Sequence, residues 1–236
     1  MMKILFMLMI FLTFSAKSQM ITHSALSDTV PVNNITRGMV DSIYRFIVSH
    51  GDVIEFEDCN ICKSRAHITA RAIEKHFEGV APGVTLGKAW LFADCRRSSQ
   101  REKYRYKPEV YLENTGVCSL WGYHVAPIII TPTDSFVIDP ATQKSAVTLS
   151  VWAGKLIPKH GEAFLVIKDK WYFIFPDDDN NLFEDEKSVW HDDNENLLDE
   201  SFSRSIDEVV RASLGLAEPW KMRSRVVKIK KLIGIE

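Results

Sequence analysis

Residues 62–77 read CKSRAHITARAIEKHF, and apolar side chains recur along this stretch at spacings of three and four residues. Such spacing places them on one face of an α-helix, with charged side chains spread around the rest of its surface. Gly79 stands just past the end, where a glycine commonly terminates a helix. The pattern predicts an amphipathic helix that begins at Cys62 and packs through four side chains, Ala66, Ala70, Ile73 and Phe77.

The sequence changes character on either side of this helix. Upstream, residues 36–50 show the same helical spacing and stop at Gly51. Downstream, from Val84, short runs of β-branched and aromatic residues alternate with turn formers, which is typical of strands, and a short helix is predicted at 148–156. We therefore expect an α+β fold in which the helix from Cys62 packs on an antiparallel sheet. The predicted strands are 84–92, 107–112, 123–130, 135–138, 163–168 and 171–175, with a hairpin turn at Asp169-Lys170 between the last two.

Composition and charge narrow the classes of function. The chain has 236 residues, of which 46% are apolar and 25% charged, an ordinary balance for one globular domain. Its formal net charge of -2 gives no overall field that would attract nucleic acid or an anionic membrane. We therefore expect no nucleic-acid partner and, in the mature protein, no membrane partner.

The N-terminus has the pattern of a secretory signal peptide. A short basic start precedes an apolar run at 4–14, and Ala16 and Ser18 supply small residues at the spacing that signal peptidases cleave. The run is well short of the roughly 20 residues that cross a bilayer as a helix, although an uncleaved anchor or a buried helix is the alternative. We predict a signal peptide at 1–18 and a secreted or periplasmic protein, in a compartment where disulfides persist.

Three segments complete the predicted organisation. Residues 19–57 form an N-terminal polar segment and helix, residues 58–176 a catalytic core, and residues 177–236 an acidic segment, a helix at 203–214 and a basic tail within the same domain. The acidic segment is interpreted as a solvated face, and calcium binding is an alternative that its spacing does not match. The tail could pair with that segment or contact an acidic partner through Lys221, Arg223, Arg225, Lys228, Lys230 and Lys231.

A cysteine at the start of a helix is suited to nucleophilic chemistry. Its reactive form is the thiolate, which a helix N-terminus and a nearby imidazolium both stabilise. His124 stands at the start of the strand 123–130 and Asp139 at the end of the next strand, so neighbouring strands would bring the two side chains together. The carboxylate would orient the ring and stabilise its charged form. The hypothesis is a catalytic triad of Cys62, His124 and Asp139.

Other residues near the triad allow two interpretations. Trp121 and Tyr123 flank the histidine and could bind substrate by lining the acyl pocket, or could pack the strand. His67 lies five residues past Cys62 and points to a different side of the helix, so a structural role is predicted for it.

Three local sequences resemble the blocks of bacterial protein-glutaminase, in the same order. Residues 62–67 resemble the C-x-x-R-A-H block of that family, 121–126 its W-x-Y-H-V-A block, and 138–140 its I-D-P block. Thr148 and Trp152 lie in a stretch that resembles the family more weakly. The resemblance makes the cysteine of the first block the nucleophile, the histidine of the second the general base and acid, and the aspartate of the third the orienting group.

The resemblance implies a papain-like or transglutaminase-like core and a thiol hydrolase without a metal or other cofactor. The implied function is that of a secreted protein-glutamine deamidase, which hydrolyses glutamine side-chain amides in proteins or peptides to glutamate and ammonia through a cysteine thioester. Members of the family resemble zymogens whose pro-segment covers the site, and residues 20–34 are too few for one. A separate inhibitor protein is therefore a candidate partner.

Several alternatives stay open on the same residues. A transglutaminase or a cysteine peptidase could use the same triad, and a non-catalytic secreted binding module could keep the fold with an inert Cys62. Cys59-x-x-Cys62 also matches a thiol-disulfide oxidoreductase. A structural zinc site is disfavoured because Cys95 and Cys118 do not form a second close pair. Spacing alone does not say which of the other three cysteines form a disulfide.

Overall fold

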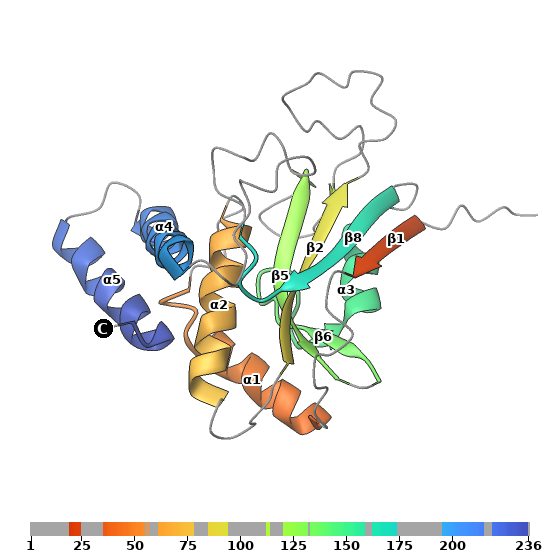
Figure 1. Cartoon of the computed structure of the whole chain (residues 1–236), viewed down its shortest axis with the longest axis horizontal. Coiled ribbons are helices and arrows are strands. Elements are labelled where there is room, and N and C mark those ends of the chain that lie inside the picture. Colours follow the sequence, from red (N-terminus) through yellow and green to blue (C-terminus); the bar gives the residue numbers. More distant parts are fainter. Residues whose placement is uncertain are drawn as a thin grey trace, which may run out of the picture.

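A sheet lies at the centre of the molecule, and helices cover both of its faces (Figure 1). The computed structural model describes residues 19–24, 35–54, 56, 61–77, 85–93, 112–113, 120–131, 133–158, 162–173, 195–214 and 219–235. Within these residues the sheet has six strands in the order β1-β8-β2-β5-β6-β7, and every neighbouring pair is antiparallel except the parallel pair β1–β8. The strands are β1 (Gln19–Ser24), β2 (Thr85–Ala93), β5 (Tyr123–Ile130), β6 (Ser135–Val137), β7 (Val147–Thr148) and β8 (Glu162–Asp169).

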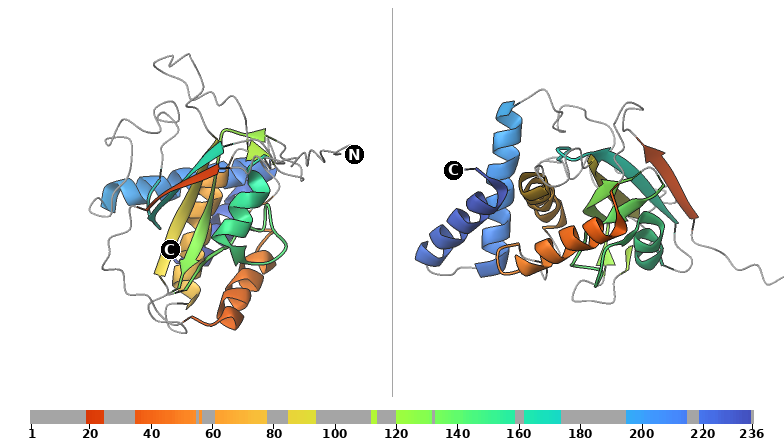
Figure 2. Two further views of the ribbon diagram at one scale, coloured as in Figure 1. Left: turned by 90° about the vertical axis from the view of Figure 1, so that its right-hand side faces the viewer. Right: turned by 90° about the horizontal axis from the view of Figure 1, so that it is seen from below.

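The helices divide unequally between the two faces. Helix α2 packs on one face, with α1, α4 and α5 gathered around it, and α3 covers the other face (Figure 2). A separate pair of short strands, β3 and β4, lies outside the main sheet. The bounds are α1 (Arg37–Ser49), α2 (Cys62–Phe77), α3 (Leu149–Leu156), α4 (Glu195–Leu214), α5 (Pro219–Ile233), β3 (Leu112–Glu113) and β4 (Leu120–Trp121).

Alternate residues of β5 belong to two different cores, because successive side chains of a strand point to opposite faces of the sheet. Val125 packs in a cluster with Cys62 of α2, whereas Ala126 and Ile128 pack in a cluster with Trp152 of α3. The predicted α+β fold, with the helix from Cys62 packed on an antiparallel sheet, is confirmed.

The most periodic parts of the sequence have the bounds that the pattern predicts. Helix α2 spans residues 62–77 and β5 spans residues 123–130, as expected. Helix α1 begins one residue after Thr36, whose side chain caps it by accepting from the backbone N–H of Met39 at 3.3 Å. The spacing of apolar residues, and for α1 the Thr36 cap, therefore determine where these elements begin and end.

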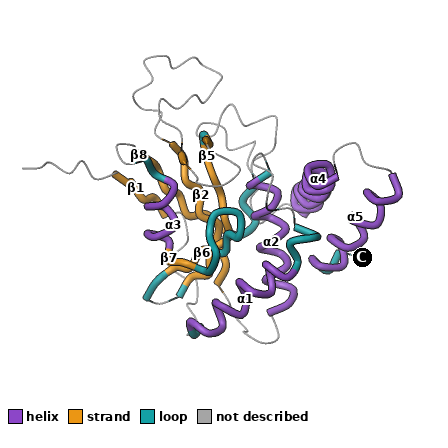
Figure 3. Tube along the Cα trace, turned by 180° about the vertical axis from the view of Figure 1, so that it is seen from behind, coloured by secondary structure: helices purple, strands orange, loops and turns teal. Residues whose placement is uncertain are grey.

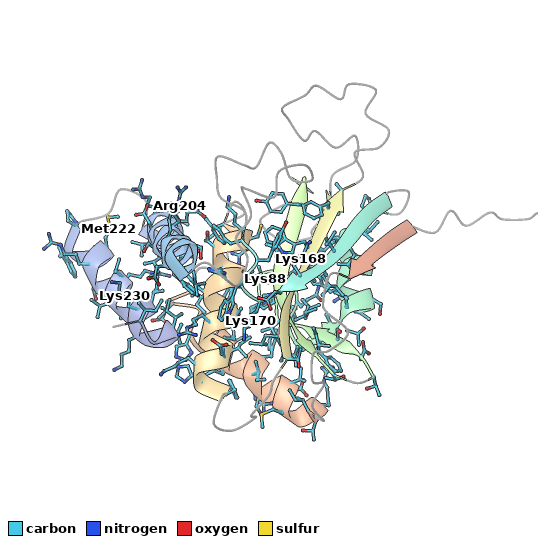
Figure 4. All side chains as sticks on the ribbon, in the orientation of Figure 1. Lys88, Lys168, Lys170, Arg204, Met222 and Lys230 are labelled. Carbon is cyan, nitrogen blue, oxygen red and sulfur yellow. The ribbon has the colours of Figure 1, made fainter. Side chains whose placement is uncertain are left out.

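A buried polar network joins α2, β2 and α4. The Nζ of Lys88, a fully buried side chain (Figure 4), lies 2.7 Å from Nδ1 of His67 and 2.9 Å from the carbonyl of Tyr172. Nε2 of His67 lies 2.8 Å from Oγ of Ser201, which itself donates to the carbonyl of Leu198. Because that hydroxyl has one proton, His67 must donate from Nε2 and accept from Lys88 at Nδ1. The role of His67 is accordingly structural, as predicted.

Burial lowers the pKa of both basic side chains in this network, His67 and Lys88. Desolvation lowers the pKa of His67 well below its usual 6.5, and the neighbouring Lys88 lowers it further. Desolvation also lowers the pKa of Lys88 well below 10.5, although the charge of Asp169 acts in the opposite direction.

The predicted hairpin at Asp169-Lys170 is wrong in its described part. The chain turns there, with the backbone N–H of Trp171 donating to the Asp169 carboxylate at 2.7 Å, and residues 171–173 form no strand. Phe173 is instead fully buried, with its ring centroid 5.0 Å from that of His67. The rings of Trp171 and Phe173 lie against Phe202 of α4 and His67 of α2, respectively, which removes apolar surface from water.

Three other segments are more regular than the sequence indicates. Residues 19–24, expected as part of a polar segment, pair along the edge of β8, whose backbone groups accept a partner strand whatever its side chains. Helix α4 begins at Glu195, inside the segment expected to be a solvated acidic face and well before the predicted start at 203. The basic tail forms helix α5, which buries one apolar face made of Ile229, Leu232 and Ile233.

Some predictions fall outside the described residues. These are the signal peptide at 1–18, the acidic stretch 177–194, the part of the predicted strand at 107–111, and the cysteines Cys59, Cys95 and Cys118. Among the helices that the structure describes, none is both long enough and apolar enough to cross a bilayer.

Candidate active site

Cys62 is the first residue of α2 and is almost fully buried. It is a free thiol and packs against Trp90, Phe92 and Val125 of the sheet. The first N–H groups of a helix have no acceptor within the helix, so they can stabilise negative charge beside this sulfur. Local sequence and packing therefore hold the thiol at a site suited to an anion.

His124 is held by the pairing of β5 with its neighbours. The residue is fully buried, and its partner across β2 is Leu91. The backbone N–H of Ile138 donates to the carbonyl of Pro127 at 3.0 Å, which continues the pairing beyond the end of β6. This pairing brings the Asp139 carboxylate to the ring, where Oδ2 lies 2.8 Å from Nε2 of His124.

Cys62 also influences the ring of His124. Its side chain is among the groups that raise the pKa of that histidine, after the larger effects of Asp139. Burial alone would lower the pKa of His124, but the charge and hydrogen bond of Asp139, together with Cys62, raise it to about 9. The surroundings therefore favour the imidazolium form.

Asp139 is a buried carboxylate with several donors. Burial alone would raise its pKa, but the charge and hydrogen bond of His124, the hydroxyl of Thr142 and the charge of Arg65 lower it to about 2. Oδ2 accepts from Oγ1 of Thr142 at 2.5 Å and from Nε1 of Trp152 at 2.9 Å. The carboxylate is thus ionised and fixed in direction, as an orienting group must be.

Sequence analysis did not assign Thr142 and Trp152 to the site. Thr142 lies in the turn that Asp139 starts, where its backbone N–H donates to the carbonyl of that residue at 3.2 Å, so a turn former three residues past the aspartate was the available signal. Trp152 comes from α3, on the far side of that turn, and also lies against His124 with ring centroids 5.8 Å apart. Only the folded chain brings it there.

We predict that replacing Trp152 with phenylalanine lowers the free energy of unfolding by about 1.5–3 kcal/mol, the usual range for a hydrogen bond to a charged group. The substitution keeps an aromatic ring beside His124 and removes a donor from the buried carboxylate of Asp139. Urea unfolding would measure the loss. The matched control is Trp220→Phe at an exposed indole, which should change stability by less than about 0.5 kcal/mol. Equal effects of the two substitutions would contradict the role given to the indole of Trp152.

Of the two residues predicted to bind substrate, the structure describes the side chain of Tyr123 but not that of Trp121. Tyr123 is partly exposed and packs against the cluster that contains Cys62, with its ring centroid 5.9 Å from those of Trp90 and Phe92. For Trp121, the backbone lies in β4, and the side chain is outside the described part of the structure. Across the described residues, no group of three or more His, Cys, Asp or Glu side chains is placed to hold a metal ion.

Comparisons with known proteins show which family this segment resembles. Residues 42–156 match the sequence model of a family described as glutaminase. The crystal structure of a protein-glutaminase is similar over 86% of this chain and 94% of its own, with 15% identity and a TM-score of 0.47. A pro-protein-glutaminase structure is similar over 90% of this chain and 66% of its own, with 15% identity and a TM-score of 0.45. A search of curated proteins found no match.

The matched segment contains all three residues of the predicted triad. The predicted resemblance to protein-glutaminase is confirmed at the level of the family. Residues 42–156 of this chain are therefore similar in sequence to the glutaminase family.

Proposed function

We propose that this chain is a protein-glutamine deamidase in which Cys62 is the nucleophile, His124 the general acid and base, and Asp139 the group that orients the ring. The observation that supports it is the buried ion pair of His124 with Asp139, in which the nearby side chain of Cys62 also raises the pKa of the histidine, inside a segment matched to the glutaminase family. The raised pKa of His124, to about 9, fits an imidazolium that is present beside the sulfur at neutral pH.

The first half of the reaction forms a thioester. The Cys62 thiolate attacks the carboxamide carbon of a glutamine side chain, and the carbonyl oxygen becomes an oxyanion. N–H groups at the start of α2, including that of Cys62, would stabilise this charge. The His124 imidazolium then gives its proton to the amide nitrogen, the C–N bond breaks, and ammonia leaves.

The second half restores the enzyme. Neutral His124 takes a proton from a water molecule, the resulting hydroxide attacks the thioester carbon, and the C–S bond breaks to release glutamate and the Cys62 thiolate. The imidazolium is regenerated in the same step. Asp139 keeps its charge throughout and holds the ring through Nε2.

The proposal also covers export, the class of fold and the absence of a cofactor. We propose that residues 1–18 are removed as a signal peptide during export, that the core is papain-like or transglutaminase-like, and that no metal or cofactor takes part. Residues 58–176 would form the catalytic core.

The partly exposed Tyr123, which packs in the cluster around Cys62, would form part of the acyl pocket together with Trp121. Proteins with exposed glutamine would be the substrates, and a separate inhibitor protein would control the enzyme.

The test uses the mature chain and a soluble protein rich in glutamine. We expect ammonia to be released and each modified glutamine to gain the mass difference between an NH₂ and an OH group, with the protein chain uncut. Free glutamine, as a parallel substrate, shows whether the site requires a peptide context. Cleaved chains would instead indicate a peptidase, cross-linked products a transglutaminase, and reduction of insulin an oxidoreductase. Because cross-linking also releases ammonia, any of these outcomes without conversion of glutamine to glutamate would overturn the proposal.

A further inference from the structure

Gln143 is a buried residue at the end of the turn that begins with Asp139. It is only 5% exposed, and its backbone N–H donates to the carbonyl of Asp139 at 3.0 Å. The first residue of this turn carries the carboxylate that contacts His124. The shape of the turn therefore decides where that carboxylate points.

A lysine sets the direction of the Gln143 side chain. Nζ of Lys155, on α3, donates to Oε1 of Gln143 at 2.6 Å. An ammonium group can only donate hydrogen bonds, so the atom that faces it must be the amide oxygen, and the NH₂ group must point the other way. There Nε2 donates to Oγ1 of Thr142 at 3.4 Å, a long bond that contributes direction more than strength.

The threonine carries this direction on to the carboxylate. Because Oγ1 of Thr142 accepts from Gln143, its single proton is left for Oδ2 of Asp139, which lies 2.5 Å away. Every donor in the series that starts at Lys155 thus points toward the carboxylate. The same Oδ2 atom lies 2.8 Å from Nε2 of His124, so the series ends at the ring.

Tyr44 holds the backbone of Gln143 from another helix. Its Oη, on α1, donates to the carbonyl of Gln143 at 2.6 Å. Burial and the charge of Asp139 raise the pKa of Tyr44 to about 12, so the phenol keeps its proton and remains a donor at neutral and mildly alkaline pH. Figure 3 shows β6, the strand that precedes the turn, between α1 and α3. Gln143 is therefore clamped between two helices.

Hydrogen bonds, more than packing, hold the turn on one of its sides. A cavity of about 790 Å³ borders it there, with Tyr44, Pro140 and Gln143 among the residues that line it. Side chains that face a cavity lack neighbours that could keep them in place by close packing. The bonds from Tyr44 and Lys155 supply that restraint.

We infer that Gln143 is a positioning residue, which fixes the turn and directs the Thr142 hydroxyl onto the carboxylate of Asp139. It acts on the reaction only through Asp139, which in turn orients the ring of His124. When the clamp is lost, the carboxylate samples more directions and its bond to Nε2 of His124 opens more often. The inference rests on the deamidase proposal, because positioning of the triad affects a reaction only if the triad is catalytic.

The first measurement follows the Nε2 proton of His124 in the mature protein by proton NMR and needs no substrate. His124 is fully buried, so this proton exchanges with water only when its bond to Asp139 opens. We expect exchange to be about three- to tenfold faster in Gln143→Met and in Lys155→Met, the change that corresponds to one lost hydrogen bond. Lys155 is exposed, so its variant tests the clamp without altering the core.

The second measurement is ammonia release from the glutamine-rich protein. In both variants kcat should fall by about three- to tenfold while KM stays within about twofold of the wild type, because Gln143 orients the triad and does not bind substrate. If the wild type releases no ammonia, the deamidase proposal fails, whereas the exchange of the His124 proton still tests the clamp.

The matched control is Lys144→Met. It removes the same charge from an exposed position next to Gln143 and leaves the bond from Lys155 intact, so the exchange rate and kcat should stay within about twofold of the wild type. The backbone amides of β5 serve as the internal reference, because a general loss of stability would speed their exchange as well. Three outcomes would overturn the inference: unchanged exchange of the His124 proton in Gln143→Met and Lys155→Met, an equal change in Lys144→Met, or an equal change in the β5 amides.

Discussion

Replacing Cys62 with alanine should reduce ammonia release from a glutamine-rich protein by about 10⁴-fold or more, the size of effect seen when a catalytic nucleophile is removed. Without the sulfur no thioester can form, and His124 and Asp139 have no acyl group to act on. The measurement is the initial rate of ammonia release at a fixed substrate concentration. It should be accompanied by mass spectrometry of the stopped reaction, in which only the wild type should carry substrate on Cys62.

The fold of this variant is the necessary control. Cys62 is almost fully buried but small, so the change to alanine removes one sulfur and should leave the unfolding midpoint within a few degrees of the wild type, about 1 kcal/mol or less. The variant Cys62→Ser keeps the shape of the side chain with a much weaker nucleophile and should be as inactive. Activity within tenfold of the wild type in either variant would remove Cys62 from the mechanism.

The second large effect is expected for Asp139→Asn. The carboxylate raises the pKa of His124 to about 9, so the imidazolium that protonates the leaving nitrogen is present below that pH and is lost as the pH rises through it. In the wild type, kcat/KM should therefore fall on the alkaline side near pH 9. Asparagine has no charge to hold the proton on the ring, so the alkaline limb should move to lower pH and the maximal rate should fall by about 10²- to 10⁴-fold.

The matched control for this change is Asp134→Asn. Asp134 is an exposed carboxylate five residues upstream, and its side chain accepts from the backbone N–H of Ser135 rather than contacting His124. The pH profile of this variant should coincide with that of the wild type. An alkaline limb that stays in place in Asp139→Asn would show that another group sets the pKa of the ring.

The same carboxylate affects stability at low pH. The pKa of Asp139 is lowered to about 2 in the folded protein from an ordinary 3.8. The stabilisation that follows is present above the ordinary value and is lost as the pH falls toward 2. Activity and stability thus depend on this one ion pair at opposite ends of the pH range.

The sequence predicts those parts of the molecule that depend on local pattern. The bounds of α2 and β5 follow from the spacing of apolar residues within each segment. The contact between His124 and Asp139 follows from the simple rule that consecutive strands tend to pair. The site is predictable to this extent because its residues lie at the ends of regular elements.

The remaining features depend on contacts between distant segments. Trp152 reaches Asp139 only because α3 folds back over the turn that follows β6, and no spacing in the sequence indicates that. Trp171 and Phe173 have the composition of a strand, but the apolar surface of α2 and α4 competes with pairing and prevails. Backbone pairing of β1 with β8 likewise needs no pattern in its side chains.

The link from Lys88 through His67 to Ser201 gives the molecule an intrinsic sensitivity to acid. As the pH drops below 6.5, the unfolded chain takes up a proton at His67 that the folded chain cannot accommodate, so acidification favours unfolding at this histidine. Protonation of His67 would disturb its hydrogen bond with Ser201, which joins α2 to α4. Because α2 also presents Cys62 at its tip, a mildly acidic medium would disturb the C-terminal helices and the reactive thiol together, long before Asp139 itself is titrated.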